Sequence, residues 1–401
     1  MQMSEMKPQI LFVGTYTPRK CGIASFTGDL VHALQQLLRN EYDIRVCALD
    51  KKSEAGKYTS PVTMVMDGCR LNSCIAGAEA INNHPAVKLV CVEHEFGLFG
   101  GNIGEFALGF LSLLNKPFII RFHTVLPDPD PERLKLIKSI CLLADKVVVM
   151  TRHSQRLLIE HYGISANKLM IIPHGTHLIP PQFSASLRAA FHLENRKILT
   201  TFGLLSPNKG IETGIRAMTR IATQFPEAIY LILGRTHPNL VETEGEAYRE
   251  YLQGLINEYQ LHDNVRLVND FIPTEQLLSY LALTDIYLFT SRDPNQAVSG
   301  TFLYAMSAGC AIISNDFVLA REMLDDETGI IINTGDDKTM AANAIYLLGN
   351  DQVRNNMGNL AFMKTRDTLW ENVARKHALL FQQMIRQQAP LLQQNDQHVT
   401  P

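Results

Sequence analysis

The stretch QILFVG at residues 9–14, followed by GIASFTGDLVHALQQLL at residues 22–38, sets the pattern of the whole chain. The first segment is short and apolar, as in a buried strand, and the second has apolar residues at helical spacing. The same pairing recurs as VKLVCVEHE at residues 87–95 and GEFALGFLSLL at residues 104–114. Repeated strand–helix pairs predict an α/β fold in which helices cover both faces of a parallel sheet.

A break in this pattern near the middle of the chain divides it into two domains. The proline-rich segment at residues 173–197 interrupts the alternation, which starts again with KILTTFG. A length of 401 residues suits two domains of ordinary size better than one core. We expect an N-terminal Rossmann-like domain at residues 1–182, a C-terminal Rossmann-like domain at 183–369, and a terminal helix with a frayed tail at 370–401.

The composition is that of an ordinary globular protein. Hydrophobic residues make up 46%, charged residues 19%, and the formal net charge is -3, so nucleic acid is not an expected partner. The start MQMSEMKPQI shows no secretory signal, and no apolar run is long enough for a transmembrane segment. The seven cysteines are scattered and form no C-x-x-C pair, so we expect a cytoplasmic protein.

Several expected strands of the first half end in loops that suit ligand binding. The loop GTYTPRKCGIASF places Gly22 just before a helix, where the backbone can approach a ligand closely. An ordinary turn is the alternative reading. His94 and Glu95 follow another strand and precede a glycine-rich loop, and His123 ends the next strand. We expect His123 to face a cleft, and His94 with Glu95 to bind sugar, although a surface histidine bonded within the protein would also fit His94.

The second half repeats this arrangement. TFGLLSPNKGIETGI ends a strand at Gly203 and reaches a helix through Lys209 and Gly210, so that the amine of Lys209 can meet a phosphate. A solvated lysine at a helix start is the alternative. Arg235, Thr236 and His237 follow the next strand end. The two expected domains therefore each present polar loops to a cleft.

A third loop of the second half is expected to hold an anion. The segment NQAVSGTFLYAMSAG at residues 295–309 follows a strand expected at residues 286–289. Its Ser299, Gly300 and Thr301 stand where a helix should begin, and helix starts attract phosphate through free N–H groups and the helix dipole.

No metal site is expected. Asp128 and Asp130 form an Asp-x-Asp pair, which holds a metal in some transferases, but each precedes a proline ahead of a helix. A turn or helix N-cap explains them better. No cluster of His and Cys has zinc spacing.

Taken together, these motifs resemble the retaining glycosyltransferases of family 4, which have the GT-B fold of two Rossmann-like domains facing across a cleft. The resemblance covers nearly the whole chain and rests on Cys21-Gly22-Ile23, His123-Thr124, His174-Gly175, Lys209-Gly210, Tyr304-Ala305-Met306, Gly309 and Trp370. It implies that the terminal tryptophan helix returns to the first domain, which takes the acceptor, while the second domain binds the donor.

The sequence departs from the family pattern at three positions. Leu204 stands where the family has arginine, and Gln296 and Tyr304 replace the two glutamates of its Glu-x7-Glu signature. The amide of Gln296 and the phenol of Tyr304 can still hydrogen bond to sugar or ribose hydroxyls. These replacements favour a rebuilt donor site, in which Arg235 or Arg292 takes the place of the missing arginine. A core aromatic is the other interpretation of Tyr304.

The resemblance implies a hexosyltransferase that moves a sugar from a nucleotide diphosphate sugar to an acceptor hydroxyl, with retention and without a metal or other cofactor. His123 and Lys209 are the expected catalytic residues. The expected donor-binding residues are Gly22, His94, Glu95, Gly203, Lys209, Arg235, Thr236, His237, Gln296, Ser299, Gly300, Thr301 and Tyr304.

The expected partners are a donor of the GDP-mannose or UDP-glucose type and a sugar or oligosaccharide acceptor. A non-catalytic GT-B protein that binds a nucleotide sugar or a partner transferase is the alternative. An epimerase or phosphorylase on the same fold fits less well, because no acid–base pair, free-phosphate site or pyridoxal lysine can be assigned.

Overall fold

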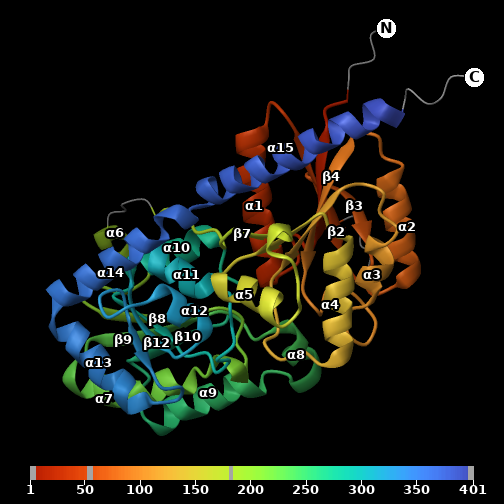
Figure 1. The fold of residues 1–401 in the computed structure, drawn as a ribbon. Helices are drawn as coiled ribbons and strands as arrows, with labels where there is room; N and C mark the ends of the chain where they lie inside the picture. The colour runs from red at the N-terminus through yellow and green to blue at the C-terminus, as the bar shows by residue number, and fades with distance from the viewer. Residues whose placement is uncertain (1–5, 52–56, 180–183, 396–401) are drawn as a thin grey trace, which may run out of the picture. The chain divides into compact units, whose positions relative to one another are not determined.

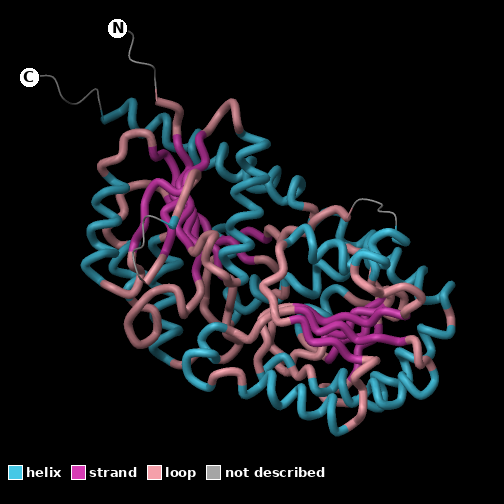
Figure 2. Tube along the Cα trace, turned by 180° about the vertical axis from the view of Figure 1, so that it is seen from behind, coloured by secondary structure: helices cyan, strands magenta, loops and turns pink. Residues whose placement is uncertain are grey.

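The computed structural model describes residues 6–51, 57–179 and 184–395. They form two compact units, each with its own parallel sheet, and in both units helices flank the sheet (Figures 1 and 2). The first unit ends at Gly175 and takes up the chain again from Trp370, whereas the second extends over Thr176–Leu369. The boundary expected between residues 182 and 183 lies outside the described residues. The two-domain Rossmann-like α/β fold is confirmed.

The first unit has a seven-stranded parallel sheet in the order β3-β2-β1-β4-β5-β6-β7. Its strands are β1 (Gln9–Gly14), β2 (Asp43–Leu49), β3 (Val62–Met66), β4 (Val87–His94), β5 (Phe118–Phe122), β6 (Lys146–Val149) and β7 (Leu169–Ile171). Its helices are α1 (Gly22–Leu38), α2 (Leu71–Asn82), α3 (Phe106–Leu111), α4 (Pro131–Leu143), α5 (Arg152–Glu160) and α15 (Trp370–Asn395), with a 3-10 turn at Ala166–Lys168.

The last helix of the chain belongs to this first unit. Helix α15 (blue) packs along α1 (red), although the two are far apart in the sequence (Figure 1). Apolar side chains such as Phe381 face the sheet and are fully buried, which explains why the helix docks there. The Gln-rich stretch continues α15 to Asn395, where fraying was expected, and the final six residues lie outside the described part of the chain.

The second unit has a six-stranded parallel sheet in the order β10-β9-β8-β11-β12-β13. Its strands are β8 (Lys197–Phe202), β9 (Ala228–Leu233), β10 (Val265–Val268), β11 (Ile286–Phe289), β12 (Ala311–Asn315) and β13 (Ile330–Ile332). Its helices are α6 (Ser184–Ala190), α7 (Glu212–Gln224), α8 (Pro238–Glu244), α9 (Ala247–Glu258), α10 (Thr274–Leu283), α11 (Gly300–Ser307), α12 (Val318–Met323), α13 (Asp337–Gly349) and α14 (Asp351–Thr365), with 3-10 turns at Pro207–Lys209 and Arg366–Thr368.

The central strands of both sheets are buried on both faces, as parallel strands covered by helices require. In β9 every residue from Ala228 to Leu233 is buried, and the same holds for β11. The strand predicted at residues 286–289 and the helix start predicted at Gly300 are both confirmed. Within the described ranges, no helix has both the length and the apolar character needed to cross a lipid bilayer.

Candidate functional site

Open parallel sheets bind ligands beyond the carboxyl ends of their strands, where the strand order reverses. In the first unit this point lies between β1 and β4, and in the second between β8 and β11. The loops after these strands contain most of the residues singled out in the sequence. Each unit therefore has a candidate site of its own.

The loop after β1 enters α1 through a glycine with free space around it. Cys21 is the N-cap of α1, and its sulfur accepts a hydrogen bond from the N–H of Ala24 at 3.4 Å. A Cβ atom added to Gly22 would meet no atom within 4 Å. Packing within the protein therefore does not require glycine here, which is consistent with the close approach of a ligand predicted for Gly22.

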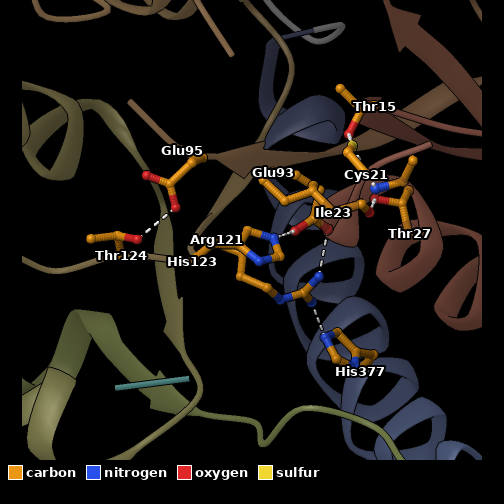
Figure 3. Close-up of polar contacts among 11 residues, drawn as sticks. Thr15, Cys21, Ile23, Thr27, Glu93, Glu95, Arg121, His123, Thr124 and His377 are labelled. Atoms are coloured by element: carbon orange, nitrogen blue, oxygen red, sulfur yellow. Dashed lines mark hydrogen bonds and ion pairs between the residues drawn. The ribbon is translucent and has the colours of Figure 1, made fainter. Parts of the chain in front are cut away.

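The ends of β4 and β5 hold a buried charged group under His123 (Figure 3). Glu93 and Arg121 are register partners on the two strands, and Nη1 of Arg121 donates to Oε1 of Glu93. The other carboxylate oxygen of Glu93 lies 2.8 Å from Nε2 of His123. Gly14 makes room for this carboxylate, because a Cβ there would lie 2.9 Å from Cβ of Glu93.

A residue of the terminal helix completes this group. Nε2 of His377 on α15 contacts Nη2 of Arg121, and Nδ1 of His377 lies 2.8 Å from the carbonyl oxygen of Val373 (Figure 3). Burial, and then the charge of Arg121, hold the pKa of His377 well below its usual value. His377 is therefore neutral at ordinary pH.

His94 does not lie where the sequence-based interpretation places it. Its side chain is fully buried and meets the rings of Phe96 and Phe122 edge-on, and neither ring nitrogen has a hydrogen-bond partner. Burial, with a smaller effect of His123, lowers its pKa to about 3. The sugar contact predicted for His94 therefore does not fit this structure, because its strand directs the ring into the apolar core. Glu95 is half-buried and accepts a hydrogen bond from the hydroxyl of Thr124 at 2.6 Å.

A cluster of aromatic rings connects the His174-Gly175 pair with Trp370, the first residue of α15. The ring of Phe26 lies 5.0 Å from His123, 5.0 Å from His174 and 5.3 Å from Trp370. A Cβ on Gly175 would lie 2.1 Å from the Trp370 ring, so only glycine fits beside it. His174 is buried, and this burial lowers its pKa to about 4. The His174-Gly175 pair and Trp370 thus pack together beside His123 in the first unit.

In the second unit two strand ends meet through glycines. Gly203 and Gly234 follow β8 and β9 and adopt φ values of 133° and 142°, which favour glycine. A Cβ on Gly234 would lie 2.0 Å from the carbonyl oxygen of Gly203, and one on Gly203 would lie 3.4 Å from the methyl group of Thr301. Gly203 therefore lies directly beside the start of α11, as its predicted binding role requires.

The Lys209 loop is joined to the loop after β11 by hydrogen bonds. The hydroxyl of Thr290 donates to the carbonyl oxygen of Lys209 at 2.7 Å, and the N–H of Arg292 donates to that of Asn208 at 2.8 Å. Burial lowers the pKa of Lys209, while Asp293 opposes this shift. The amine of Lys209 also lowers the pKa of His237, after burial, so these two predicted residues lie near each other.

Arg292 is held over this loop by a buried acid. Its guanidinium pairs with Glu212 in the first turn of α7, and the hydroxyl of Tyr248 donates to Glu212 at 2.7 Å. The Arg292 side chain is 53% exposed, whereas that of Glu212 is 4% exposed. Gly210 has a φ of 59°, and a Cβ there would lie 3.2 Å from Cγ of Arg292. Arg292 thus lies on top of the turn after Lys209.

The other predicted donor residues have different environments. Thr236 is buried and its hydroxyl donates to Glu246, so the nucleotide contact predicted for it does not fit this structure. Arg235 and His237 are partly exposed. Their backbones pair with Leu205, which fixes the loop after β9 against the loop after β8.

The start of α11 is built as expected, but its side chains are engaged within the protein. Ser299 is the N-cap, and its hydroxyl accepts from the N–H of Phe302 at 3.4 Å. The Gln296 amide bonds Ser291 at 3.1 Å and Val298 at 3.0 Å. Tyr304 is 9% exposed within an apolar cluster, with its ring 5.2 Å from that of His177.

The turn interpretation of the Asp-x-Asp pair is confirmed for Asp130, which caps α4 by accepting from the N–H of Arg133 at 2.9 Å. Across the described parts of the chain, no group of three His, Cys, Asp or Glu residues is arranged to hold a metal ion. All seven cysteines have free thiols.

Several structurally important polar residues were not singled out in the sequence. Arg121 looks like an isolated charge within an apolar segment, Glu212 stands among polar residues at a helix start, and His377 lies in a helix far from the other site residues in the sequence. A charged residue inside a strand that is otherwise buried is a usable signal, because such a charge needs a partner. For His377 the sequence carries no such signal.

Two family models match the chain. The model described as Glycosyltransferase Family 4 matches residues 22–178, and the model described as Glycosyl transferases group 1 matches residues 184–362. Among curated proteins, a putative glycosyltransferase YtcC of Bacillus subtilis is 27% identical over 59% of this chain and 60% of the relative. A GDP-mannose-dependent α-(1-6)-phosphatidylinositol monomannoside mannosyltransferase of Mycolicibacterium smegmatis is 24% identical over 48% of this chain and 50% of the relative. The chain thus spans less than two thirds of the length of these relatives.

Solved structures share the fold across nearly the whole chain. Anabaena Alr3699/HepE, in complex with UDP and glucose, matches with a TM-score of 0.71 and 15% identity over 94% of this chain and 100% of that chain. Sucrose-phosphate synthase from Thermosynechococcus elongatus matches with a TM-score of 0.74 and 18% identity over 95% of this chain and 100% of that chain. These similarities confirm the fold.

Proposed function

The chain belongs to the glycosyltransferases that join a family 4 domain to a group 1 domain in a GT-B fold, and we propose that it transfers a sugar from a nucleotide diphosphate sugar to a hydroxyl of a sugar acceptor. The observation that carries the proposal is the loop cluster of the second unit. There Gly203, Lys209 and the start of α11 surround the carboxyl ends of β8 and β11. A donor of the GDP-mannose or UDP-glucose type fits this proposal, since one relative is named GDP-mannose-dependent and a protein of the same fold has been solved with UDP-glucose.

The second unit supplies positive charge for the diphosphate that leaves the sugar. The first turn of α11 offers backbone N–H groups at Gly300 and Thr301, because the first N–H groups of a helix have no partner within the helix. The half-buried Lys209 adds a positive charge to this loop cluster, and fixed donors of this kind stabilise developing negative charge. We propose transfer with retention and without a metal, in which the leaving diphosphate assists deprotonation of the acceptor.

Arg292 is the better candidate for the arginine that the family has at the position of Leu204. Its guanidinium lies over the turn after Lys209 and uses Glu212 as one partner, and its exposed half leaves donors for a phosphate. The buried Glu212 and Tyr248 hold the guanidinium in place. Arg235, whose backbone is hydrogen bonded to Leu205, is the alternative candidate for this role.

A panel of nucleotides and nucleotide sugars tests this proposal directly. Binding raises the unfolding temperature by mass action, so UDP, GDP and their sugars identify the donor. Turnover is then followed with that donor in the presence and absence of EDTA, and the anomeric proton coupling of the product reports retention or inversion. Donor binding without hydrolysis or transfer would support a non-catalytic binding protein instead, and dependence on added Mg²⁺ or Mn²⁺ would overturn metal independence.

Replacing Lys209 with alanine should cripple turnover while leaving folding nearly intact. A charged hydrogen bond to phosphate contributes about 1.5–3 kcal/mol, which corresponds to roughly ten- to hundredfold in diphosphate affinity or turnover. Calorimetric titrations with the nucleoside diphosphate and the nucleoside of the same base measure the effect. The diphosphate should lose affinity and the nucleoside should not.

The matched control is Lys338→Ala, which removes an exposed lysine from α13 of the same unit. It should bind and turn over donor like the wild type. Near wild-type activity of Lys209→Ala at saturating donor would remove Lys209 from the site.

The contact of Tyr304 with ribose remains a prediction, and Tyr304→Phe tests it. The variant keeps the packing of the ring against His177 and removes only the phenol oxygen. Losing one hydrogen bond should weaken donor binding by about 0.5–1.5 kcal/mol, or about two- to tenfold. Donor affinity that stays unchanged in a stable Phe variant would instead identify Tyr304 as a core residue.

A further inference from the structure

A continuous row of polar side chains runs through the apolar interior of the first unit and ends at His123. It consists of His377, Arg121, Glu93 and His123, in contact in that order (Figure 3). The first three are buried, whereas His123 is partly exposed at the end of β5. Burying an ion pair inside a sheet costs desolvation free energy, so it contributes little to stability by itself. Its position beneath a candidate catalytic histidine suggests another role.

The direction of each hydrogen bond follows from the chemistry of the atoms. The carbonyl oxygen of Val373 can only accept, so Nδ1 of His377 carries the proton and its Nε2 is an acceptor. That acceptor suits Arg121, whose nitrogens only donate. Arg121 is thereby held between His377 and Glu93.

The same reasoning fixes the proton on His123. Nη1 of Arg121 donates to Oε1 of Glu93, and the other oxygen of a carboxylate in such an ion pair can only accept. Nε2 of His123, 2.8 Å from that oxygen, must therefore carry a proton. In the neutral imidazole Nδ1 is then left with a lone pair.

We propose that Glu93, Arg121 and His377 are positioning residues, which hold His123 in the tautomer whose Nδ1 accepts a hydrogen bond from a hydroxyl of the bound sugar. This inference rests on the proposed function, because it takes His123 as the residue that contacts the sugar. The terminal helix α15 then supports the site through His377, 256 positions away from Arg121 in the sequence.

Glu93→Gln gives the sharpest test, since it is isosteric and removes only the charge. The amide oxygen of glutamine should stay with Arg121, which turns its NH₂ group toward His123. Two donors cannot face each other, so Nε2 of His123 should become the acceptor and the proton should move to Nδ1. NMR of the protein labelled with ¹⁵N-histidine distinguishes the two tautomers without any substrate.

The kinetic consequence follows from the same switch. Nδ1–H would meet the sugar hydroxyl as a donor, so kcat should fall by about ten- to hundredfold. The KM for donor should change much less, because the altered hydrogen bond involves one sugar hydroxyl and not the diphosphate. A residue that only supports folding would instead lower the amount of active enzyme and leave the His123 tautomer as it is.

Two further comparisons separate positioning from folding. His377→Gln keeps an acceptor for Arg121 and should retain the wild-type tautomer and kcat, whereas His377→Leu removes it and should lower kcat by about tenfold. The control is Glu41→Gln, which alters the exposed contact that Glu41 makes with Gln382 of α15, far from His123. This variant should behave like the wild type. These variants still decide the matter if Glu93→Gln does not fold.

The proposal is overturned if wild-type His123 carries its proton on Nδ1, or if the tautomer is the same in Glu93→Gln. Equal kcat values for His377→Leu and His377→Gln would likewise remove α15 from the site. Failure of the proposed function would give a different result. The wild type would then turn over no nucleotide sugar, while NMR would still show whether Glu93, Arg121 and His377 determine the His123 tautomer.

Discussion

Gly234→Ala should destabilise the second unit by about 2–6 kcal/mol. The added Cβ would lie 2.0 Å from the carbonyl oxygen of Gly203, closer than packed atoms approach, and the φ of 142° suits only glycine. Overpacking costs about 1–3 kcal/mol, and a side chain in such a backbone conformation costs about as much again. The backbone cannot move aside cheaply, because the N–H of Gly203 donates to Leu233 and that of Gly234 to Val268.

Gly254→Ala provides the matched control in the same unit. Gly254 lies in α9, where an added Cβ would meet no atom within 4 Å, so the substitution should stabilise the helix by about 0.5–1 kcal/mol. Urea unfolding followed by circular dichroism compares the two variants with the wild type. Equal stability of Gly234→Ala and Gly254→Ala would show that the two strand ends are not as tightly joined as the structure indicates.

The alternation of strands and helices predicts the fold well because it is a local property. The strand Ile286–Phe289 and the start of α11 at Gly300 follow from a run of apolar residues and from Ser-Gly-Thr a short distance further along the chain. Shorter or less regular elements escape this reasoning. Helix α6 at Ser184–Ala190 lies inside the segment expected to be a linker, since a seven-residue helix shows too little periodicity to be recognised.

The candidate site is less predictable because side-chain direction depends on tertiary packing. His94 is the last residue of β4 and His123 directly follows β5, yet His94 is buried among aromatic rings while His123 is partly exposed beside Glu93. Neighbouring residues of a strand point to opposite faces, so a shift of one position decides between core and site. The pairing of Glu93 with Arg121 needs the strand order, and the contact with His377 needs the docking of α15, neither of which sequence spacing contains.

Lowering the pH from 7.5 to 5 should weaken the first unit by about 2 kcal/mol for each of the buried histidines His94 and His174, and the buried His377 should add to this loss. Burial lowers the pKa of His94 to about 3 and that of His174 to about 4, and it holds the pKa of His377 well below its usual value. In the unfolded chain each of them regains an ordinary pKa near 6.5. The unfolded state therefore binds more protons as the pH falls below 6.5, and stability is lost with the acid.

These losses together approach the whole stability of an ordinary domain, so the first unit should unfold in mild acid. The charge of Arg121 strengthens the effect by lowering the pKa of His174 and of His377, whereas the carbonyl groups of Gly175 and Val373, and the charge of Asp29 near His174, oppose it. Urea midpoints at several pH values, with hydrogen exchange to identify the unit that opens, measure it.

His94→Leu isolates one of the three contributions. Leucine replaces an imidazole that has no hydrogen-bond partner, so it should be neutral or stabilising at pH 7.5 and should flatten the pH dependence by about 1.4 kcal/mol per pH unit near pH 5. The control His32→Gln removes an exposed histidine and should leave the slope unchanged. The window from pH 6.5 to 5 separates the histidines from acids such as Asp325, whose contribution to stability is lost only between its unfolded pKa of about 3.9 and its folded pKa of about 2. If His94→Leu and the wild type lose stability in parallel, His94 must already be solvated or paired in the folded protein, and its burial among Phe96 and Phe122 would be wrong.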